Sequence, residues 1–228
     1  MPMVRTPASI RRSRDWQSNE MTPVELIALA ASTSLLAGWR LYLVTLVTGV
    51  AMKFGWIALP DHLDALDVLA NNWVIGIAAV GTFAEFFADK VAWVDSAWDA
   101  IHSFIRPLGG ALLSLAIIDS ADPAWQIASF LLGGGAAFVA HAGKAGARTL
   151  VNASPEPFSN MLVSTGEDIA TGGLLALAIA NPVAAALIAL LLVGLSVWLV
   201  IAARRALRRM IDRLNPAPPP RVEPVKGD

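Results

Sequence analysis

Two carboxylates in an apolar setting are the first residues of this sequence that could take part in chemistry. Glu85 and Asp89 lie four residues apart in TFAEFFADK, so a helix would place both on one face. Two carboxylates that face each other in a medium of low dielectric constant cannot both ionise cheaply, so we expect the pKa of at least one to be raised. Such a pair suits the handling of a proton or cation. The alternative is a helix end in headgroup water, with Asp89 paired to Lys90 or Arg106.

Basic residues supply candidate counter-charges. Arg40 interrupts LLAGWRLYL in the middle of a long apolar segment, and a central arginine costs about 2.5–3.5 kcal/mol on membrane insertion scales. It must face a partner, water or a cavity, unless it snorkels from a helix boundary with the segment split there. His141, Lys144 and Arg148 follow one another on adjacent turns. We expect Arg40 and Arg148 to bind anionic groups or balance the acids; the alternative for 141–148 is a basic collar at the membrane interface.

A second acidic pair, Glu167 and Asp168, lies in STGEDIATGG. As a functional pair, it would add Glu167 to Glu85 as a carrier of a coupling proton or cation. Asp89, Asp168 and Lys144 would complete, with Arg40 and Arg148, the seven residues predicted to bind the solute or ion. As a structural pair, the two acids would lie in the first turn of a helix capped by Ser164 or Thr165, where they complement the helix dipole. The sequence leaves both interpretations open.

A metal site is the third candidate. Asp95, Asp99 and His102 share a helix face. They lack a matching second pair of ligands, there is no H-E-x-x-H motif, and the chain has no cysteine. We therefore expect no metal and no cofactor. These three residues are instead expected to support the binding residues or to lie in a cytoplasmic loop, together with Lys90, Arg106 and His141.

The composition identifies the medium that surrounds these residues. Of 228 residues 56% are hydrophobic and 15% charged, with a mean hydropathy of +0.59, whereas an ordinary soluble domain carries about 25% charged residues. Lipid is the simplest solvent for such a chain. The net charge of −1 gives no reason to expect a nucleic-acid partner. The absence of cysteine excludes thiolate catalysis, and no serine lies in a recognisable His–acid arrangement, so we do not expect an enzyme.

We predict an all-α polytopic transmembrane helical bundle of about six spans. A spanning helix needs roughly 17–25 mostly apolar residues. The first segment is long enough to tilt or to break near Gly38, and Asn181-Pro182 could be a kink rather than a hairpin, so five or seven spans stay open. The predicted spans are 24–50, 73–88, 108–120, 125–142, 167–181 and 183–203.

Between these spans we predict loops, of which 89–107 and 143–166 are long enough to be re-entrant. The spacing of Asp95, Asp99 and His102 predicts a short amphipathic helix at the cytoplasmic face that ends at Arg106-Pro107, where the third span begins. The predicted layout is a disordered cytoplasmic tail over 1–20, a transmembrane domain over 21–206, and a charged, Pro-rich cytoplasmic tail over 207–228.

The basic residues predict the orientation. Of the 17 Lys and Arg residues, all but Lys53 and Arg40 fall in tails and loops on one side of a six-span arrangement. Because cytoplasmic loops carry an excess of Lys and Arg, both termini are predicted to lie in the cytoplasm, in the inner membrane of a bacterium.

An internal repeat is a further prediction. One alignment matches Gly38-x-Arg40 to Gly146-x-Arg148 and Glu85-x-x-Ala88 to Glu167-x-x-Ala170. A competing alignment sets LGGALLSLAI against TGGLLALAI, but runs of Leu, Ala and Gly match by chance in membrane proteins. We favour the first because it pairs rare charged residues. Spans one to three would then repeat as four to six in inverted orientation, and each half would supply one Arg and one Glu near a helix break.

Four blocks of the sequence resemble a known family. GWRLYL, EFFADKVAWVDSAWDAIHSFIRPLGGALL, HAGKAGAR and STGEDI are similar to recurring blocks of an uncharacterised, domain-of-unknown-function family of small bacterial integral membrane proteins. The resemblance covers about Met21 to Ala203, and its most specific part is E-x-x-A-D-K…V-D…D-x-x-H…R-P-x-x-G. It implies an inner-membrane protein with several spans and names no substrate.

The leading hypothesis is a transporter or channel for a small polar solute or ion, with the lipid bilayer as its other partner and a homo-oligomer left open. One alternative is a membrane scaffold or assembly factor whose buried charges form structural ion pairs. Another is a lipid-handling protein in which the face of Asp95, Asp99, His102 and Arg106 meets lipid phosphates.

Overall fold

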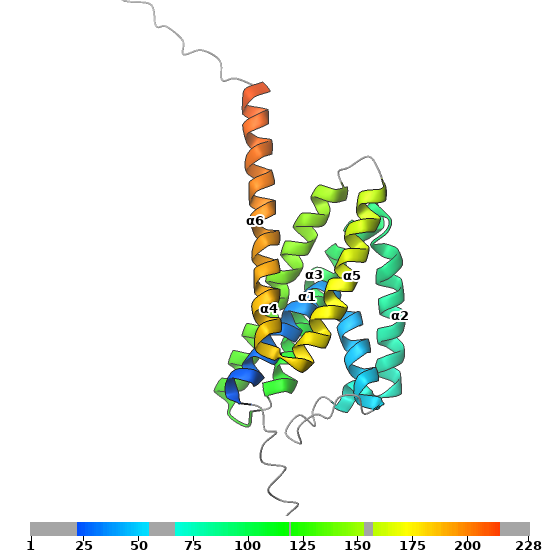
Figure 1. Ribbon diagram of the computed structural model, residues 1–228, viewed down its shortest axis with the longest axis vertical. Helices are drawn as coiled ribbons and strands as arrows, with labels where there is room; N and C mark the ends of the chain where they lie inside the picture. The colour runs from blue at the N-terminus through cyan, green and yellow to red at the C-terminus, as the bar shows by residue number, and fades with distance from the viewer. Residues whose placement is uncertain (1–21, 55–66, 119, 153–156, 215–228) are drawn as a thin grey trace, which may run out of the picture.

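The structure, a computed structural model, describes residues 22–54, 67–118, 120–152 and 157–214 (Figure 1). Over these ranges the chain is helical and contains no strand. Five of the helices are long and apolar enough to cross a membrane, and α2, with 17 residues, is shorter. The predicted all-α membrane bundle is confirmed. The helices are α1 (Pro23–Lys53), α2 (Asn72–Ala88), α3 (Ala92–Ile118), α4 (Pro123–Asn152), α5 (Pro157–Ala180) and α6 (Pro182–Leu214).

Local sequence explains where several helices begin. Thr22 and Glu25 form a capping box at the start of α1, and the Asn71 side chain accepts a hydrogen bond from the Trp73 amide of α2. Asn181 accepts one from the Ala184 amide at 3.0 Å, and Pro182 occupies the first position of α6. Asn181-Pro182 therefore separates two helices and is not a kink within one.

Helix α1 bends sharply at Arg40, whose φ of −144° and ψ of 69° are not helical. Of the two alternatives left open for this segment, a tilted helix or a break near Gly38, the structure has the break, two residues further on. The two limbs form an inverted V in Figure 1, with both ends at the lower edge of the bundle. Contacts agree with this view, because Lys53 hydrogen-bonds Asn72 at the start of α2 while Arg40 meets Asp89 just beyond its end. The chain thus enters the bundle, turns at Arg40 and returns to the same end.

The return of α1 changes the expected topology. Helices α2 to α6 run alternately up and down, so the start of α1 and the end of α6 lie at opposite ends of the bundle (Figure 1). The six-span arrangement places both tails on one side, and the described helices do not have that arrangement. The physical reason is the break at Arg40, which converts the first predicted crossing into a V.

The predicted loops at 89–107 and 143–166 are largely helical, so the predicted boundaries were wrong there. Helix α3 starts at Ala92 and continues through Pro107 to Ile118. Most of 143–166 belongs to α4 and α5, whose described ends are Asn152 and Pro157. These polar stretches stay helical because their charged side chains find partners on other helices rather than in water.

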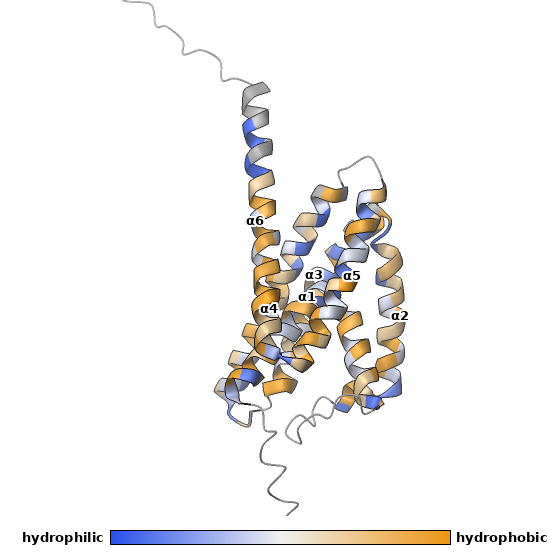
Figure 2. Ribbon diagram, viewed as in Figure 1, coloured by the Kyte–Doolittle hydropathy of each residue, from blue (hydrophilic) through white to orange (hydrophobic). Residues whose placement is uncertain are grey.

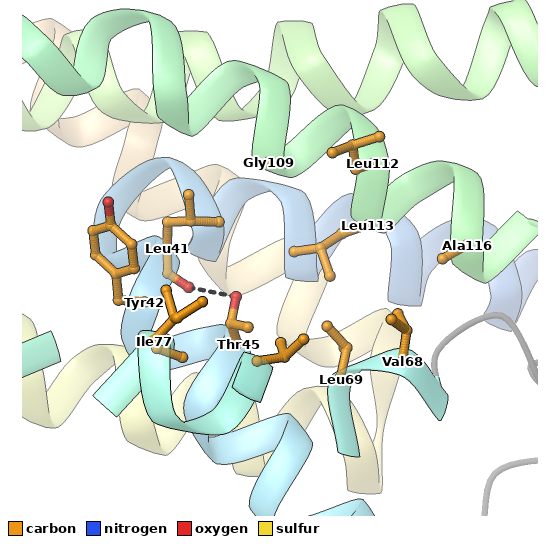
Figure 3. A pocket seen from close by; sticks show the side chains of 12 residues that line it. Leu41, Tyr42, Thr45, Val68, Leu69, Ile77, Gly109, Leu112, Leu113 and Ala116 are labelled. Atoms are coloured by element: carbon orange, nitrogen blue, oxygen red, sulfur yellow. Dashed lines mark hydrogen bonds between the residues drawn. The ribbon is translucent and has the colours of Figure 1, made fainter. Parts of the chain in front are cut away.

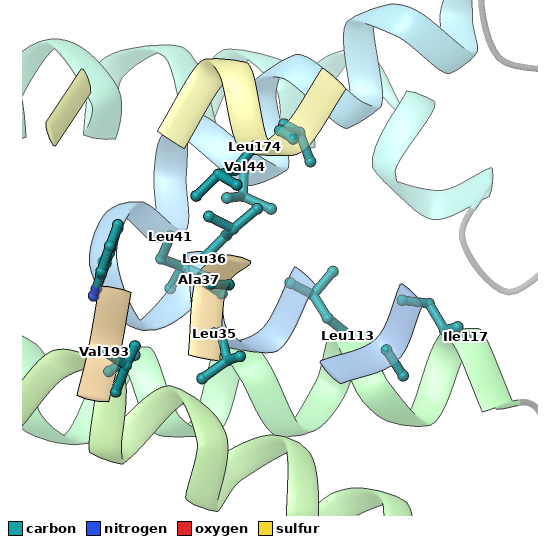
Figure 4. Close-up of a cluster of buried hydrophobic side chains, with 14 of the residues drawn as sticks. Leu35, Leu36, Ala37, Leu41, Val44, Leu113, Ile117, Leu174 and Val193 are labelled. Carbon is teal, nitrogen blue, oxygen red and sulfur yellow. The ribbon is translucent and has the colours of Figure 1, made fainter. Parts of the chain in front are cut away.

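Small residues bring the helices close together. A Cβ atom built on Gly38 would lie 2.3 Å from the carbonyl oxygen of Ala137, so α1 and α4 cross at a distance that only glycine permits. Around this crossing, Leu36, Leu113 and Val193 belong to one buried apolar cluster (Figure 4). Apolar residues also cover the outside of α2 and most of α6 (Figure 2), as lipid-facing helices require.

Candidate functional site

Charged side chains from α1, α3, α4, α5 and the end of α2 meet inside the bundle at the apex of α1. All seven residues predicted to bind a solute or ion lie in this group, together with four of the supporting ones. Most are 5% exposed or less; the side chains of Glu167 and Asp168 are 18% and 26% exposed. We call this group the ion cluster: Arg40, Glu85, Asp89, Asp95, Asp99, Arg106, His141, Lys144, Arg148, Glu167 and Asp168.

Arg40 joins three helices at the break in α1. Its Nη1 atom lies 2.5 Å from Asp89 Oδ2, and its Nη2 atom lies 3.0 Å from Asp168 Oδ1 and 3.2 Å from the Ser164 carbonyl oxygen. Arg40 is 1% exposed, so it does not snorkel. The break also frees the Trp39 carbonyl, which accepts a hydrogen bond from Lys144 Nζ at 3.2 Å.

Asp89, in the link between α2 and α3, is the anion at the centre of the cluster. Besides Arg40, its Oδ2 atom has Lys144 Nζ at 3.4 Å and Arg148 Nη2 at 3.5 Å. Burial alone would raise the pKa of Asp89, but the charges of Lys144, Arg40 and Arg148 outweigh it and hold this pKa below its ordinary value. The sequence predicts a raised pKa for at least one carboxylate of the 85/89 pair, and Asp89 is not that carboxylate, because it has cationic partners of its own.

Arg106 organises a second part of the cluster between α2, α3 and α4. Its Nη2 atom lies 2.5 Å from Glu85 Oε1, and its Nη1 atom lies 2.8 Å from Asp99 Oδ1 and 2.6 Å from His141 Nδ1. A guanidinium only donates, so Nδ1 must carry a lone pair and His141 is neutral with its proton on Nε2. That nitrogen faces the Asp99 carbonyl oxygen at 3.1 Å. Arg106 thus pairs with Glu85, and not with Asp89.

Lys144 and Arg148 link the two parts. Lys144 Nζ lies 3.7 Å from Glu85 Oε1 and 3.4 Å from Asp89 Oδ2. Arg148 Nη2 donates to the Asp89 backbone carbonyl at 2.7 Å and lies 3.3 Å from Asp95 Oδ1. The basic run 141–148 is therefore inside the bundle, and it does not form a collar at the membrane interface.

Lys90 and His102 lie at the edge of the cluster. Lys90 Nζ is 3.2 Å from Ser164 Oγ and 3.8 Å from the centre of the Phe86 ring. His102 stacks on Trp98, and its ring nitrogens contact the Trp98 carbonyl oxygen at 2.7 Å and the Tyr42 hydroxyl at 3.1 Å. Over the described ranges, no three His, Asp or Glu side chains are placed to hold a metal ion.

Sequence reasoning missed two polar residues of α5. Asn160 donates to the Asp89 backbone carbonyl at 2.9 Å and accepts from Arg148 Nη1 at 2.8 Å. The sequence suggests Ser164 only as a helix cap, yet α5 begins at Pro157, so Ser164 lies inside the helix and binds Arg40. The signal was available, because 160, 164 and 168 are spaced by four and share one helix face.

Two cavities lie beside α3, and one of them borders the cluster. A crevice of about 180 Å³ between α3 and α4 is lined by Asp95, Asp99, Ser103 and Arg148, among others. It brings a polar surface up to the charged groups. A second pocket, of about 430 Å³, lies between α1, α2 and α3 and is lined by no residue of the ion cluster.

The larger pocket is apolar (Figure 3). Its two lining hydroxyls are satisfied elsewhere, since Thr45 Oγ1 donates to the Leu41 carbonyl at 2.9 Å and the Tyr42 hydroxyl contacts His102. This pocket could hold a hydrophobic group, and no charged side chain lines it. The chemistry of the molecule therefore lies in the ion cluster.

The comparisons with known proteins agree with the resemblance seen in the sequence. Residues 27–202 match the family model described as a domain of unknown function, DUF4126, and the chain belongs to that family. No curated protein and no solved structure matches the chain.

Proposed function

We propose that this member of the DUF4126 family is an integral membrane protein that transports a small polar solute or ion through the ion cluster. The observation that carries the proposal is the gathering of charged groups from five helices at one break in α1. A broken helix inside a membrane is tolerated where protein or a cavity satisfies its backbone, and such breaks form the binding sites of many transporters.

The charges of the cluster do not balance. Its six carboxylates face four Lys or Arg side chains, and Lys90 at the edge adds one more cation. An uncompensated carboxylate inside a membrane is expensive, so at least one proton or cation is expected to be held there. We assign this role to Glu85 and Glu167, with Arg40 and Arg148 as the groups that bind anions or balance the acids.

A solute could reach the ion cluster along its partly exposed edges. Glu167 and Asp168 are partly exposed on α5, and the crevice beside Arg148 approaches the cluster between α3 and α4. The Arg-rich end of α6 is assigned to the cytoplasm by the excess of basic residues there, in the inner membrane of a bacterium.

Flux measurements test the proposal. The full chain is reconstituted in liposomes, and proton movement is followed with an internal pH dye under an imposed gradient. Wild-type protein is expected to increase the flux, and Glu85→Gln and Glu167→Gln are each expected to abolish that increase. Glu25→Gln makes the same chemical change in the first turn of α1, outside the cluster, and serves as the control. Unchanged flux in both cluster variants would refute the assignment of these residues.

A structural scaffold is the second candidate, and the burial of the charges favours it. Arg40, Asp89, Arg106 and Arg148 are 1% exposed or less. The exchange Glu85→Arg with Arg106→Glu separates the two functions, because it keeps a buried pair while moving the carboxylate. A scaffold should fold with the exchanged pair and show no flux in any form. A transporter should fold and lose the wild-type flux.

The lipid-handling alternative gains no support from the structure. Asp95, Asp99, His102 and Arg106 are 5% exposed or less and face the interior of the bundle. Apart from the crevice that Asp95 and Asp99 line, they form no surface that lipid phosphates could reach.

A further inference from the structure

We propose that the transported solute is a small anion carrying a carboxylate or phosphate group, and that Glu167 occupies its binding position when the solute is absent. This inference rests on the proposed transport function and names the substrate class of the same site.

The geometry around Glu167 differs from that of the other carboxylates in the cluster. Its Oε2 atom has three cationic groups at similar distances: Arg40 Nη2 at 3.5 Å, Lys144 Nζ at 3.8 Å and Arg148 Nε at 4.0 Å. These distances exceed those of ordinary hydrogen bonds, and Glu167 Oε2 accepts none. Three cations therefore surround this oxygen without holding it tightly, which is the arrangement of an anion site filled by a poorly fitting group.

Two of these three cationic groups have an unused donor. The Nε atoms of Arg40 and Arg148, like that of Arg106, are buried and make no hydrogen bond. A buried donor without an acceptor is costly, so such groups in a native structure call for a missing partner. Arg148 Nε is the atom that lies 4.0 Å from Glu167 Oε2, and an added oxygen between the cations would satisfy it. Phosphate and carboxylate oxygens are the acceptors that guanidinium groups bind best.

The position of Glu167 is arranged for an anion and not for a metal cation, and a solute anion there would replace the charge of Glu167 rather than add to the six carboxylates of the cluster. The cations converge on shared points, since Arg40, Lys144 and Arg148 all approach both Asp89 and Glu167. The carboxylates do not converge in this way, because no three acidic or His side chains among the described residues are placed around a common ion position.

Asp89 is a fixed anion of the cluster, whereas Glu167 is an exchangeable one. Asp89 is 0% exposed, and its backbone carbonyl is bound by Arg148 and Asn160, so it stays in place. The Glu167 side chain is 18% exposed at the edge of α5, and a Cβ atom added to the neighbouring Gly166 would meet no atom within 4 Å. This partial exposure allows Glu167 to swing out when a solute anion takes its place.

Anion binding to the intact chain in lipid nanodiscs tests the inference. Inorganic phosphate and acetate, as potassium salts, are titrated by calorimetry, with potassium chloride at matched ionic strength as the blank. If Glu167 fills the site more than nine-tenths of the time, Glu167→Gln should bind these anions about tenfold more tightly than wild type. Glu25→Gln should bind as wild type does. Lys144→Gln in the Glu167→Gln background should lose the gain.

Two outcomes would overturn the inference. One is equal or weaker anion binding in Glu167→Gln compared with wild type, provided that its thermal unfolding shows a folded protein. The other is proton flux in liposomes that is unaffected by either anion, which would leave transport standing and remove the anion as its solute. The opposite result, tighter anion binding in Glu167→Gln together with no proton flux through the wild-type protein, would leave the anion site standing and refute transport.

Discussion

The ion cluster and the apolar cluster are built by largely the same helices and are buried to the same degree, yet they are stable for different reasons. Leu36 and Arg40, one turn apart on α1, are both 1% exposed. Leu36 needs only neighbours of the right volume, which the other members of the apolar cluster supply (Figure 4). Arg40 needs specific carboxylates at hydrogen-bonding distance, which Asp89 and Asp168 provide.

This difference shows how a membrane protein can combine rigidity with a polar site. In lipid the apolar cluster gains from close packing and not from leaving water, so its energy is spread over many contacts. The ion cluster concentrates its energy in a few pairs, whose partners come from different helices. Loss of one partner should therefore be far more damaging there than loss of one apolar side chain.

The largest effect is expected for Arg40→Met. Removing the guanidinium leaves Asp89 and Asp168 short of a counter-charge inside the bundle, which should lower the free energy of unfolding by about 3–5 kcal/mol. Unfolding in mixed micelles with increasing SDS measures the change. The double variant Arg40→Met with Asp89→Leu should recover most of the loss, because no orphaned charge remains at the centre. A single variant as stable as wild type would show that the pair is not structural.

Lowering the pH should also decrease the free energy of unfolding, by less than Arg40→Met does. The pKa of Asp89 is lowered in the folded protein, mainly because the charges of Lys144, Arg40 and Arg148 overcome the effect of burial. Asp89 therefore contributes stability that is complete above its unfolded pKa and is lost as the pH falls through its folded pKa. Unfolding measured from pH 7 downward should show this decline, with a shallower decline in Asp89→Asn. Parallel curves for the two proteins would contradict the assignment.

In the apolar cluster, Leu36→Ala should cost about 2–3 kcal/mol, because it leaves a cavity between α1 and its neighbours. The same SDS titration measures it. Anion binding and flux should change less than in Arg40→Met, since no charge moves. A loss as large as that of Arg40→Met would mean that the two clusters are not energetically distinct.

The smallest effects on stability are expected for alanine substitutions at two glycines of α4, which should differ from each other. A Cβ atom on Gly133 would lie 2.3 Å from Ser114 Cβ, whereas one on Gly135 would meet no atom within 4 Å. Gly133→Ala should therefore cost about 1–3 kcal/mol through overpacking. Gly135→Ala should be neutral or slightly stabilising, because alanine is the better helix former. Equal stability of the two variants would show that α3 and α4 do not pack this closely.

Much of the site could be predicted from residue type alone. Arg40, Glu85 and Glu167 are conspicuous because charged residues are rare in such apolar surroundings. The pairing could not be predicted, since Arg40 meets Asp89 from 49 residues away in sequence and Asp168 from further still. The role of Ser164 was missed because the predicted helix begins too late in the sequence. The inverted repeat stays a prediction.

The sequence by itself determined the medium, the helical class and the identity of the buried charges, because hydropathy and helical spacing are local properties. Only the tertiary structure decided that α1 turns back at Arg40, that the polar stretches 92–107, 143–152 and 157–166 are helical, and which ions pair. The reason is physical: a charged helical stretch is predicted as a loop when water is its assumed partner. It becomes part of the interior once other helices supply the opposite charges.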